Sequence, residues 1–279
     1  MTREIYPCLW FDGNAKQAAE FYCSLFNNAR ITTETPMVVL FELHGKDFMG
    51  LNGGPHYMFT PAISFFPNCE SVQETDAMWS ALIDGGKALM PIGKYPWSER
   101  YGWVQDKFGL TWQIMLCPTV EGKRKIMPSL LFTKNQFGRA EEATKFYSTV
   151  FAHSTTGTIE RYPATDKHAG KVMYSEFTIG EQTMIAMDGP DVHDYTFNEA
   201  VSFVVSCDTQ DEIDYYWQKL TADGGQESMC GWLKDKFGVS WQVVPSILGR
   251  LMDDPEKGQR VVQAFLKMKK FDIQALLDA

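Results

Sequence analysis

The stretch YGWVQDKFGLTWQI occupies residues 101–114, and CGWLKDKFGVSWQV occupies residues 230–243. Two further pairs of segments repeat in the same order along the chain. They are AAEFYCSLFNNARI (18–31) with ATKFYSTVFAHSTT (143–156), and AISFFPNCESVQETDAMW (62–79) with AVSFVVSCDTQDEIDYYW (200–217). Three repeated blocks in one order indicate a tandem duplication of the whole segment.

The repeated stretch predicts a tight turn followed by a buried strand. In the turn DKFG, Asp accepts local backbone hydrogen bonds and Gly suits the last position. Along the strand that follows, Trp112 and Gln113 point to opposite faces, as do Trp241 and Gln242 in the second copy. We expect the Trp face to pack on a helix. Each Gln must find a hydrogen-bond partner, because a buried unpaired amide costs about 1–3 kcal/mol.

Each half of the chain is predicted to contain two βαβββ units, which gives an α+β fold. Asn14 is expected to cap the first helix, which carries the sequence FY. Residues 88–99 and 160–171 occur in one half only and are expected to be loops. The predicted domains are residues 1–119 and 126–247, joined by a turn-rich, charged boundary at 118–125. Residues 248–279 are expected to form a helical arm, with a helix start at Asp254-Pro255-Glu256, that packs on its own chain or on a partner.

The composition argues against several classes of function. The 279-residue chain carries a formal net charge of −9, which disfavours binding to nucleic acid. No signal peptide and no run of about 18 apolar residues is present, so we expect no membrane insertion. The six cysteines form no CxxC pair and no zinc-ligand spacing. These features predict a cytoplasmic protein with reduced thiols.

The paired FY helices and FG-x-x-WQ strands resemble the vicinal oxygen chelate superfamily, which includes glyoxalase I, extradiol dioxygenases, and bleomycin and fosfomycin resistance proteins. More narrowly, the chain looks like the PhnB-like branch, which carries a 3-demethylubiquinone-9 3-methyltransferase domain name. The segments that carry this resemblance are LWFDGNAKQAAEFY (9–22), LNGGPHYMFTPAISFF (51–66), CGWLKDKFGVSWQVVP (230–245) and FLKMKKFDIQALLDA (265–279). The resemblance implies tandem glyoxalase-like domains, each of two βαβββ modules that form a curled mixed sheet with flanking helices.

The resemblance also implies where a metal would be held, on the first and last strands of the modules. The matching positions in this chain are Pro7, Pro128, Gln113 and Gln242, with Ala62 and Ala200 near the first-strand positions of the other modules. Proline and alanine have no side-chain donor atom, and a neutral amide is a weak ligand for transition metals. We therefore expect no metal. The Gly-Gly pairs follow helices or lead into a loop, so we expect no S-adenosylmethionine or other cofactor.

Six residues are candidates for ligand binding. Gln113 and Gln242 are expected to face the hollow of each curled sheet, with Pro7 and Pro128 beside them. The alternative is that each amide is a core residue bonded to backbone. Tyr95 and Trp97 are expected to cover an apolar or aromatic ligand, or else to cap the core of the first half.

Two residues are catalytic candidates. His56, in a loop between two modules, could shuttle a proton, or belong to an ordinary loop. Glu176, in a strand, could be a general base if it points inward, or the polar side of an amphipathic strand if it points outward.

Together these features favour metal-independent binding of a small apolar or aromatic molecule in a sheet-lined cup. One alternative is an enzyme of the superfamily, whether lyase, dioxygenase or ubiquinone-type methyltransferase, that uses a carboxylate base. Another is a structural module without a ligand. The duplication predicts a pseudo-dimer within one chain, and a monomer or homodimer in solution.

Overall fold

The structure is a computed structural model that describes residues 5–119, 125–190 and 193–279. The described residues of the first half form two βαβββ modules. The first module comprises β1 (Ile5–Phe11), α1 (Ala15–Leu25), β2 (Arg30–Glu34), β3 (Val38–Leu43) and β4 (Lys46–Asn52). The second comprises β5 (Ile63–Cys69), α2 (Val72–Ile83), β6 (Lys87–Tyr95), β7 (Ser98–Gln105) and β8 (Thr111–Leu116). Most of the expected boundary at 118–125 lies outside the described residues.

The second half repeats the pattern. The third module comprises β9 (Ile126–Phe132), α3 (Ala140–Val150), β10 (Thr155–Arg161), β11 (Val172–Ile179) and β12 (Gln182–Asp188). The fourth comprises β13 (Val201–Cys207), α4 (Gln210–Thr221), β14 (Gln226–Glu227), β15 (Trp232–Lys234) and β16 (Ser240–Pro245). The predicted α+β fold of βαβββ modules is confirmed.

The modules pair across the two halves of the sequence. Sheet A has the strand order β14-β15-β16-β13-β1-β4-β3-β2, so it joins the fourth module to the first. Sheet B has the order β10-β11-β12-β9-β5-β8-β7-β6, and joins the third module to the second. The antiparallel contacts of β1 with β13 and of β5 with β9 make these connections. Each eight-stranded sheet therefore contains strands from both copies of the repeat.

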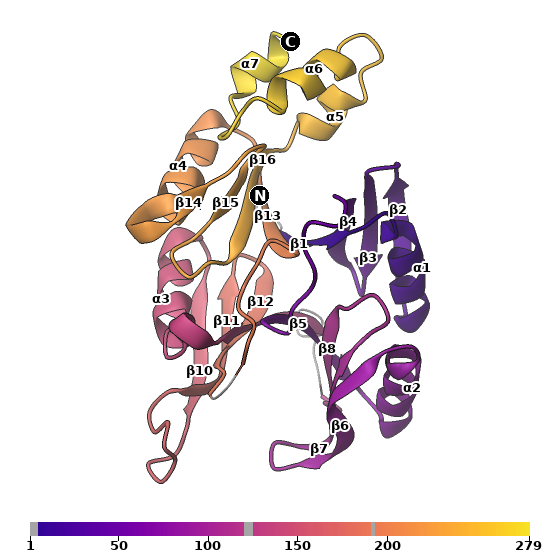
Figure 1. Ribbon diagram of the computed structural model, residues 1–279, viewed down its shortest axis with the longest axis vertical. Helices are drawn as coiled ribbons and strands as arrows, with labels where there is room; N and C mark the ends of the chain where they lie inside the picture. The colour runs from indigo at the N-terminus through magenta and orange to yellow at the C-terminus, as the bar shows by residue number, and fades with distance from the viewer. Residues whose placement is uncertain (1–4, 120–124, 191–192) are drawn as a thin grey trace.

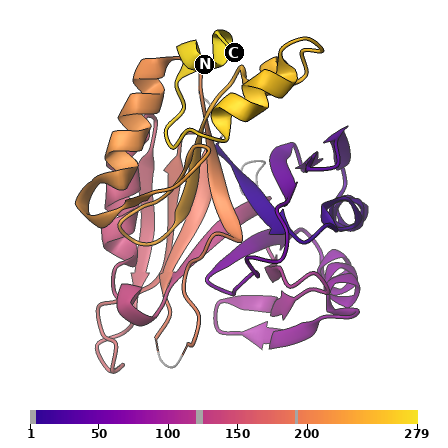
Figure 2. The ribbon, with the colours of Figure 1, turned by 45° about the horizontal axis from the view of Figure 1, so that its top comes forward.

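The helices lie on the outer face of each sheet, with α1 and α2 along one flank of the molecule and α3 and α4 along the other (Figures 1 and 2). The outer faces of the two sheets share one apolar core, in which Phe48 of sheet A lies 5.3 Å from Phe65 of sheet B between ring centroids. We call the opposite face of each sheet its inner face. Residues that alternate with the helix-packed residues of a strand lie on this inner face.

A buried aspartate explains why DKFG and the downstream Trp recur together. One carboxylate oxygen of Asp106 accepts hydrogen bonds from the Tyr22 hydroxyl (2.9 Å) and the Trp112 indole (2.8 Å). The other accepts from the backbone N–H of Phe108 (2.8 Å) and Leu110 (3.0 Å). Asp106 thus joins α1 of the first module to the turn and strand of the second, which holds the two modules of one half together although their strands belong to different sheets.

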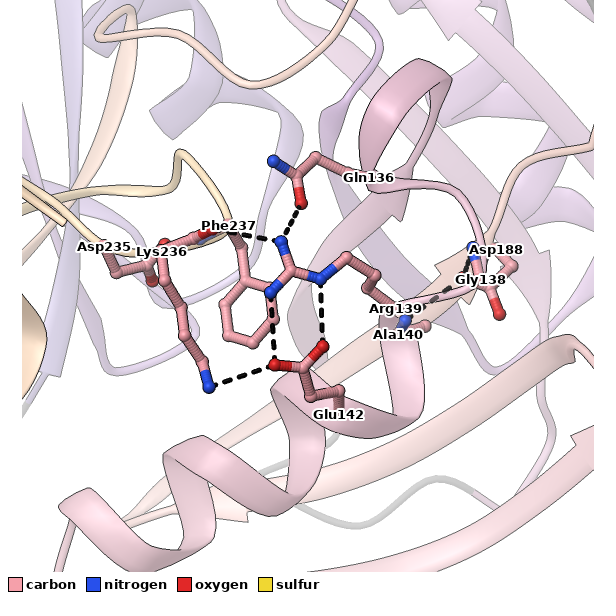
Figure 3. Close-up of polar contacts among 9 residues, drawn as sticks. All are labelled: Gln136, Gly138, Arg139, Ala140, Glu142, Asp188, Asp235, Lys236 and Phe237. Atoms are coloured by element: carbon pink, nitrogen blue, oxygen red, sulfur yellow. Dashed lines mark hydrogen bonds and ion pairs between the residues drawn. The ribbon is translucent and has the colours of Figure 1, made fainter. Parts of the chain in front are cut away.

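Asp235 repeats this arrangement in the second half. It accepts from the Tyr147 hydroxyl at 2.7 Å and the Trp241 indole at 2.9 Å, and from two backbone N–H groups of its own turn. Burial raises the pKa of Asp235, and these hydrogen bonds oppose the shift. Close by, the Arg139 guanidinium stacks on the Phe237 ring, 4.5 Å from its centroid, and pairs with Glu142 at the start of α3 (Figure 3).

The helix starts differ from the sequence prediction. Asn14 makes no side-chain capping bond; instead the Asn52 side chain, from the end of β4, accepts from the N–H of Ala15 at 3.0 Å. The prediction that Asn14 caps this helix is therefore wrong, because a neighbouring strand end supplies the acceptor. Asp188 at the end of β12 does the same for α3, accepting from Gly138 (2.8 Å) and Ala140 (3.1 Å) (Figure 3).

The segment 88–99 is not the loop that its composition predicts. Residues up to Tyr95 belong to β6, which pairs with β7 and forms one edge of sheet B. Pro91 is compatible with this strand because an edge strand has one side without ladder hydrogen bonds. Of the other predicted loop, 160–171, the first two residues end β10, and residues 162–171 form the loop that connects β10 to β11.

The C-terminal arm packs on the chain itself. It contains three short helices, α5 (Leu248–Met252), α6 (Gly258–Phe265) and α7 (Ile273–Leu277). Its connecting segment supplies backbone acceptors at Met268 and Lys269 to Cys230 and Gly231, each at 2.7 Å. Phe271 is buried against Gly231, where no side chain larger than hydrogen fits without a clash.

We predict that Asp235→Asn lowers the free energy of unfolding by about 2–6 kcal/mol. The amide leaves two of four buried donors without an acceptor, and each such loss costs about 1–3 kcal/mol. Urea denaturation measures the change, and Asp84→Asn at an exposed position is the matched control. A change at Asp235 no larger than in the control would contradict this role.

Candidate functional site

The inner face of sheet B carries a row of polar side chains, Gln113, Ser64 and Ser129, next to an apolar cluster. Gln113 is 3% exposed; its carbonyl accepts from the Tyr101 hydroxyl at 2.6 Å, and its amide donates to the Ser64 hydroxyl at 2.8 Å. The apolar cluster consists of Phe66, Tyr101, Met127 and Ile185, with Met90, Tyr95, Trp103, Met115, Tyr174 and Met187 packed against it. The strand phase predicted for Gln113 is the observed one, and side chains rather than backbone satisfy its amide.

The two aromatic residues proposed to cover a ligand lie on this face. Tyr95 ends β6, and Trp97 follows in the turn before β7; their rings stack with centroids 5.1 Å apart. Both contact the ring of Tyr101, at 5.4 and 5.5 Å. Trp97 is 56% exposed, so its outer side is open to solvent. The structure therefore brings Tyr95 and Trp97 together with Gln113.

Two buried polar atoms on this face lack a hydrogen-bond partner among the described residues. They are Nε1 of Trp103, which lies opposite Gln113 in the ladder, and Oγ of Ser129, which lies opposite Ser64. Glu176 is on the same face, two strands beyond Ser129, and accepts from the Tyr174 hydroxyl at 2.6 Å. This is the inward direction on which its candidacy as a general base depends, and that role stays a prediction.

Sheet A repeats part of this row with different side chains. The Gln242 amide donates to the Ser202 hydroxyl at 2.9 Å, as Gln113 does to Ser64. Cys8 lies opposite Ser202, and its burial raises the pKa of the thiol to about 12 against hydrogen bonds from Gln242 and Ser202. A thiol with this pKa is a poor nucleophile at neutral pH.

A pocket of about 330 Å³ opens beside this row in sheet A. Its aromatic walls are Trp10 of β1, Tyr57 of the loop after β4, and Trp232 of β15, which lies opposite Gln242. The pocket is also lined by Glu199, Gln226, Glu227, Ser228, Met229, Cys230, Leu233, Lys234 and Ser240. First-half and second-half residues thus meet in one site.

The repeat alignment accounts for the room at this position. In the aligned stretches, Cys230 takes the place of Tyr101, whose large ring and hydroxyl occupy the inner face of sheet B. Sheet A also ends in β14, a strand of two residues, where sheet B has the nine residues of β6. A smaller side chain and a shorter edge hairpin leave space on sheet A.

The indole of Trp10 is fixed in the pocket wall by the Gly-Gly pair that follows β4. Its Nε1 donates to the carbonyl of Gly54 at 2.7 Å. A Cβ atom at Gly53 would lie 2.2 Å from the indole ring, so only glycine allows this approach. The sequence NGGP therefore shapes the pocket.

The remaining candidates lie elsewhere. Pro7 is opposite Phe203 and Pro128 is opposite Phe65, and both phenylalanines pack in the outer core. Paired residues share a face, so the register turns both prolines toward the helices and away from the inner faces. His56 is exposed and precedes Tyr57, but does not itself line the pocket.

The donor set does not fit a metal centre. In the part of the chain that the structure describes, no group of three or more His, Cys, Asp or Glu side chains could hold a metal ion. Of the family positions, Gln113 and Gln242 face inward, and their neighbours are the hydroxyls of Ser64 and Ser202 and the thiol of Cys8. Amides, hydroxyls and thiols are weak ligands in their neutral forms.

The glycine pairs do not form a nucleotide-binding turn. Gly85 and Gly86 end α2, and a Cβ at Gly86 would lie 2.3 Å from the carbonyl oxygen of Gln105. Gly53 and Gly54 follow a strand, but they lead into β5 rather than into a helix. A phosphate-binding turn needs a helix N-terminus directly after the glycines.

Among the described residues, no helix is long and apolar enough to cross a membrane.

Comparison with known proteins agrees with this architecture. Glyoxalase I from Zea mays aligns over 86% of this chain and 90% of its own, with a TM-score of 0.57 at 11% identity, which establishes a glyoxalase-like fold. The sequence profile of the 3-demethylubiquinone-9 3-methyltransferase family matches residues 3–115 and 124–244. The chain belongs to this family.

One similar solved structure covers a single repeat. The PhnB protein from Bacillus cereus is 35% identical over 39% of this chain and 96% of its own, with a TM-score of 0.38. No curated protein matches the sequence. The resemblance to the PhnB-like branch is confirmed, as are the tandem glyoxalase-like modules.

Trp10, Tyr57 and Trp232 were not among the residues predicted from the sequence to bind a ligand. The alternation of β1 places Trp10 opposite in direction to the core residue Leu9, so its inward direction was available from the sequence. The meeting of Trp10 with Trp232 depends on the pairing of β1 with β13, which no local pattern specifies.

The unpartnered hydroxyl gives a stability prediction. Ser64→Ala removes the acceptor of the buried Gln113 amide and is expected to lower the free energy of unfolding by about 1–3 kcal/mol. Ser129→Ala removes a hydroxyl without a partner, so the free energy of unfolding should stay the same or rise. Urea denaturation of both variants checks this contrast. Equal losses would show that Ser129 also makes a stabilising bond.

Proposed function

We propose that this protein binds a small aromatic or apolar molecule in the sheet A pocket, without a metal ion. The observation that carries the proposal is the pocket between Trp10, Tyr57 and Trp232. Small-molecule sites are concave, mostly apolar and few per protein, with a few placed polar groups that fix orientation. Its volume of about 330 Å³ is at the lower end of the usual range for such sites.

Two side chains of the pocket, Trp10 and Lys234, are held in place by contacts within the chain. The Trp10 indole is fixed by Gly53 and by its bond to Gly54. Lys234, at the pocket lining, is paired with Glu199 at 2.7 Å. A site whose side chains are already ordered loses less conformational entropy on binding, and this supports recognition by shape.

Polar groups for orientation lie next to the aromatic walls. Ser240 lines the pocket, and Gln242 is opposite Trp232 in the ladder. Glu199, Glu227 and Cys230 also line the pocket, but among the described residues no group of acidic, histidine and cysteine side chains is placed to hold a metal ion. The site therefore supports binding rather than a metal-dependent lyase or dioxygenase reaction.

We predict that Trp232→Leu abolishes ligand-induced stabilisation, while Trp103→Leu retains it. Trp103 is the repeat-equivalent residue on sheet B, so it controls for the loss of one inner-face tryptophan. A thermal-shift screen of small aromatic compounds provides the measurement. A compound at about 100 times its Kd stabilises the folded state by about 2.7 kcal/mol.

Two results would contradict the proposal that the sheet A pocket binds an aromatic or apolar molecule. Compounds that stabilise Trp232→Leu as strongly as the unchanged protein would place binding outside this pocket. If no aromatic compound changes the melting temperature or the tryptophan fluorescence of the unchanged protein, the proposed function fails.

A further inference from the structure

Three aromatic rings line the sheet A pocket, and Trp10 makes an edge-to-face contact with each of the other two. The ring centroids of Trp10 and Tyr57 are 5.0 Å apart with an interplanar angle of 80°, and those of Trp10 and Trp232 are 5.9 Å apart at 79°. Trp10 is the shared wall, and the other two rings stand nearly perpendicular to it. All three rings line the same pocket, and a cation–π contact reaches about 6 Å from a ring centroid, so a cation in the pocket meets an aromatic lining.

The charges that line the pocket favour a cation. Two carboxylates, Glu199 and Glu227, line it together with one ammonium, that of Lys234. The ammonium is already paired with Glu199 at 2.7 Å. A hydrogen bond from the Trp217 indole to Glu227, at 2.9 Å, lowers the pKa of that carboxyl, so it is ionised at neutral pH. Glu227 also pairs with Lys269 outside the pocket lining, at 3.5 Å; both side chains are exposed, and such a surface pair is weak.

The net charge of the whole chain also favours a cationic ligand. The whole chain carries a formal net charge of −9, which attracts cations and repels anions. An anionic ligand would need an unpaired cation in the lining, and Lys234 is committed to Glu199. A neutral ligand would use the aromatic walls but gain nothing from the carboxylates.

We propose that the sheet A pocket recognises an organic cation, with an alkylated ammonium group placed between Trp10, Tyr57 and Trp232. This inference rests on the proposed function, because it names the class of ligand for the same pocket. The aromatic faces attract the positive charge, and the methyl groups of a quaternary ammonium exclude water without needing hydrogen-bond partners. Glu227 adds a carboxylate to the pocket lining, and its exposed partner Lys269 lies 3.5 Å from it, outside the lining.

The test compares two probes of equal shape and different charge. Choline and 3,3-dimethylbutan-1-ol differ only in a quaternary nitrogen or carbon at the branched centre. Each is titrated into the full chain while tryptophan fluorescence and the indole N–H resonances are followed. Choline is expected to bind about tenfold more tightly than the alcohol, and to weaken as salt concentration rises.

Variants assign the effect to this pocket. Trp232→Leu should remove choline binding, and the matched Trp103→Leu variant on sheet B should keep it. Glu227→Gln should weaken choline binding by about threefold. Its amide oxygen can still accept from Trp217, so the fold is kept.

The titrations separate a failure of the cation inference from a failure of the pocket assignment and of the proposed binding function. Equal affinity for choline and the alcohol would overturn the cation preference and leave the proposed binding function in place. Choline binding that survives in Trp232→Leu would overturn the assignment to this pocket. Absence of choline binding overturns the cation inference; if aromatic compounds also leave the unchanged protein unaffected, the proposed function fails with it.

Discussion

The pairing of β1 with β13 and of β5 with β9 builds both sheets across the two halves of the chain. Both contacts are antiparallel and run between the two copies of the sequence repeat. Because of them, each inner face combines strands from both halves. The buried aspartates Asp106 and Asp235 meanwhile tie together the two modules of a single half through helix, turn and strand. The halves are thus linked by backbone ladders, and the modules within a half by buried side chains.

The two inner faces show how one scaffold gives two chemical surroundings. In sheet B, Tyr101 bonds to Gln113 and lies under Tyr95 and Trp97. In sheet A, Cys230 stands in place of Tyr101, and a pocket lies between aromatic residues instead. The amide and its serine partner remain the same in both. Both copies of the repeat therefore keep the Gln–Ser pair on the inner face and differ in the side chains that lie next to it.

The sequence predicts the features that depend on local pattern. The duplication, the βαβββ modules and the opposite directions of Trp112 and Gln113 all follow from repeats and from the two-residue period of a strand. It fails where a residue from another element decides the outcome. Asn14 has the right chemistry for a cap, yet Asn52 provides it across the fold.

Among the candidate site residues, the sequence likewise predicts those that depend on strand alternation and fails for those that depend on strand pairing. Gln113, Tyr95, Trp97 and Glu176 reach the inner face of sheet B, while Pro7 on β1 faces the helices because the ladder sets it opposite Phe203. The pocket could not be assembled from the sequence, since Trp10 and Trp232 meet only through strands that pair across the halves. Local alternation fixes the direction of a side chain but not its neighbour on the next strand.

Formation of a disulfide across β1 and β13 tests the cross-half pairing most directly. Cys8 lies opposite Ser202, and directly opposed antiparallel residues have Cα separations that a disulfide can bridge. Ser202→Cys, refolded under oxidising conditions and digested, should yield a disulfide-linked peptide pair containing position 8 and position 202. The same substitution with Cys8→Ser should yield none. A correctly refolded Ser202→Cys protein in which position 202 links instead to a cysteine of its own half would contradict the account.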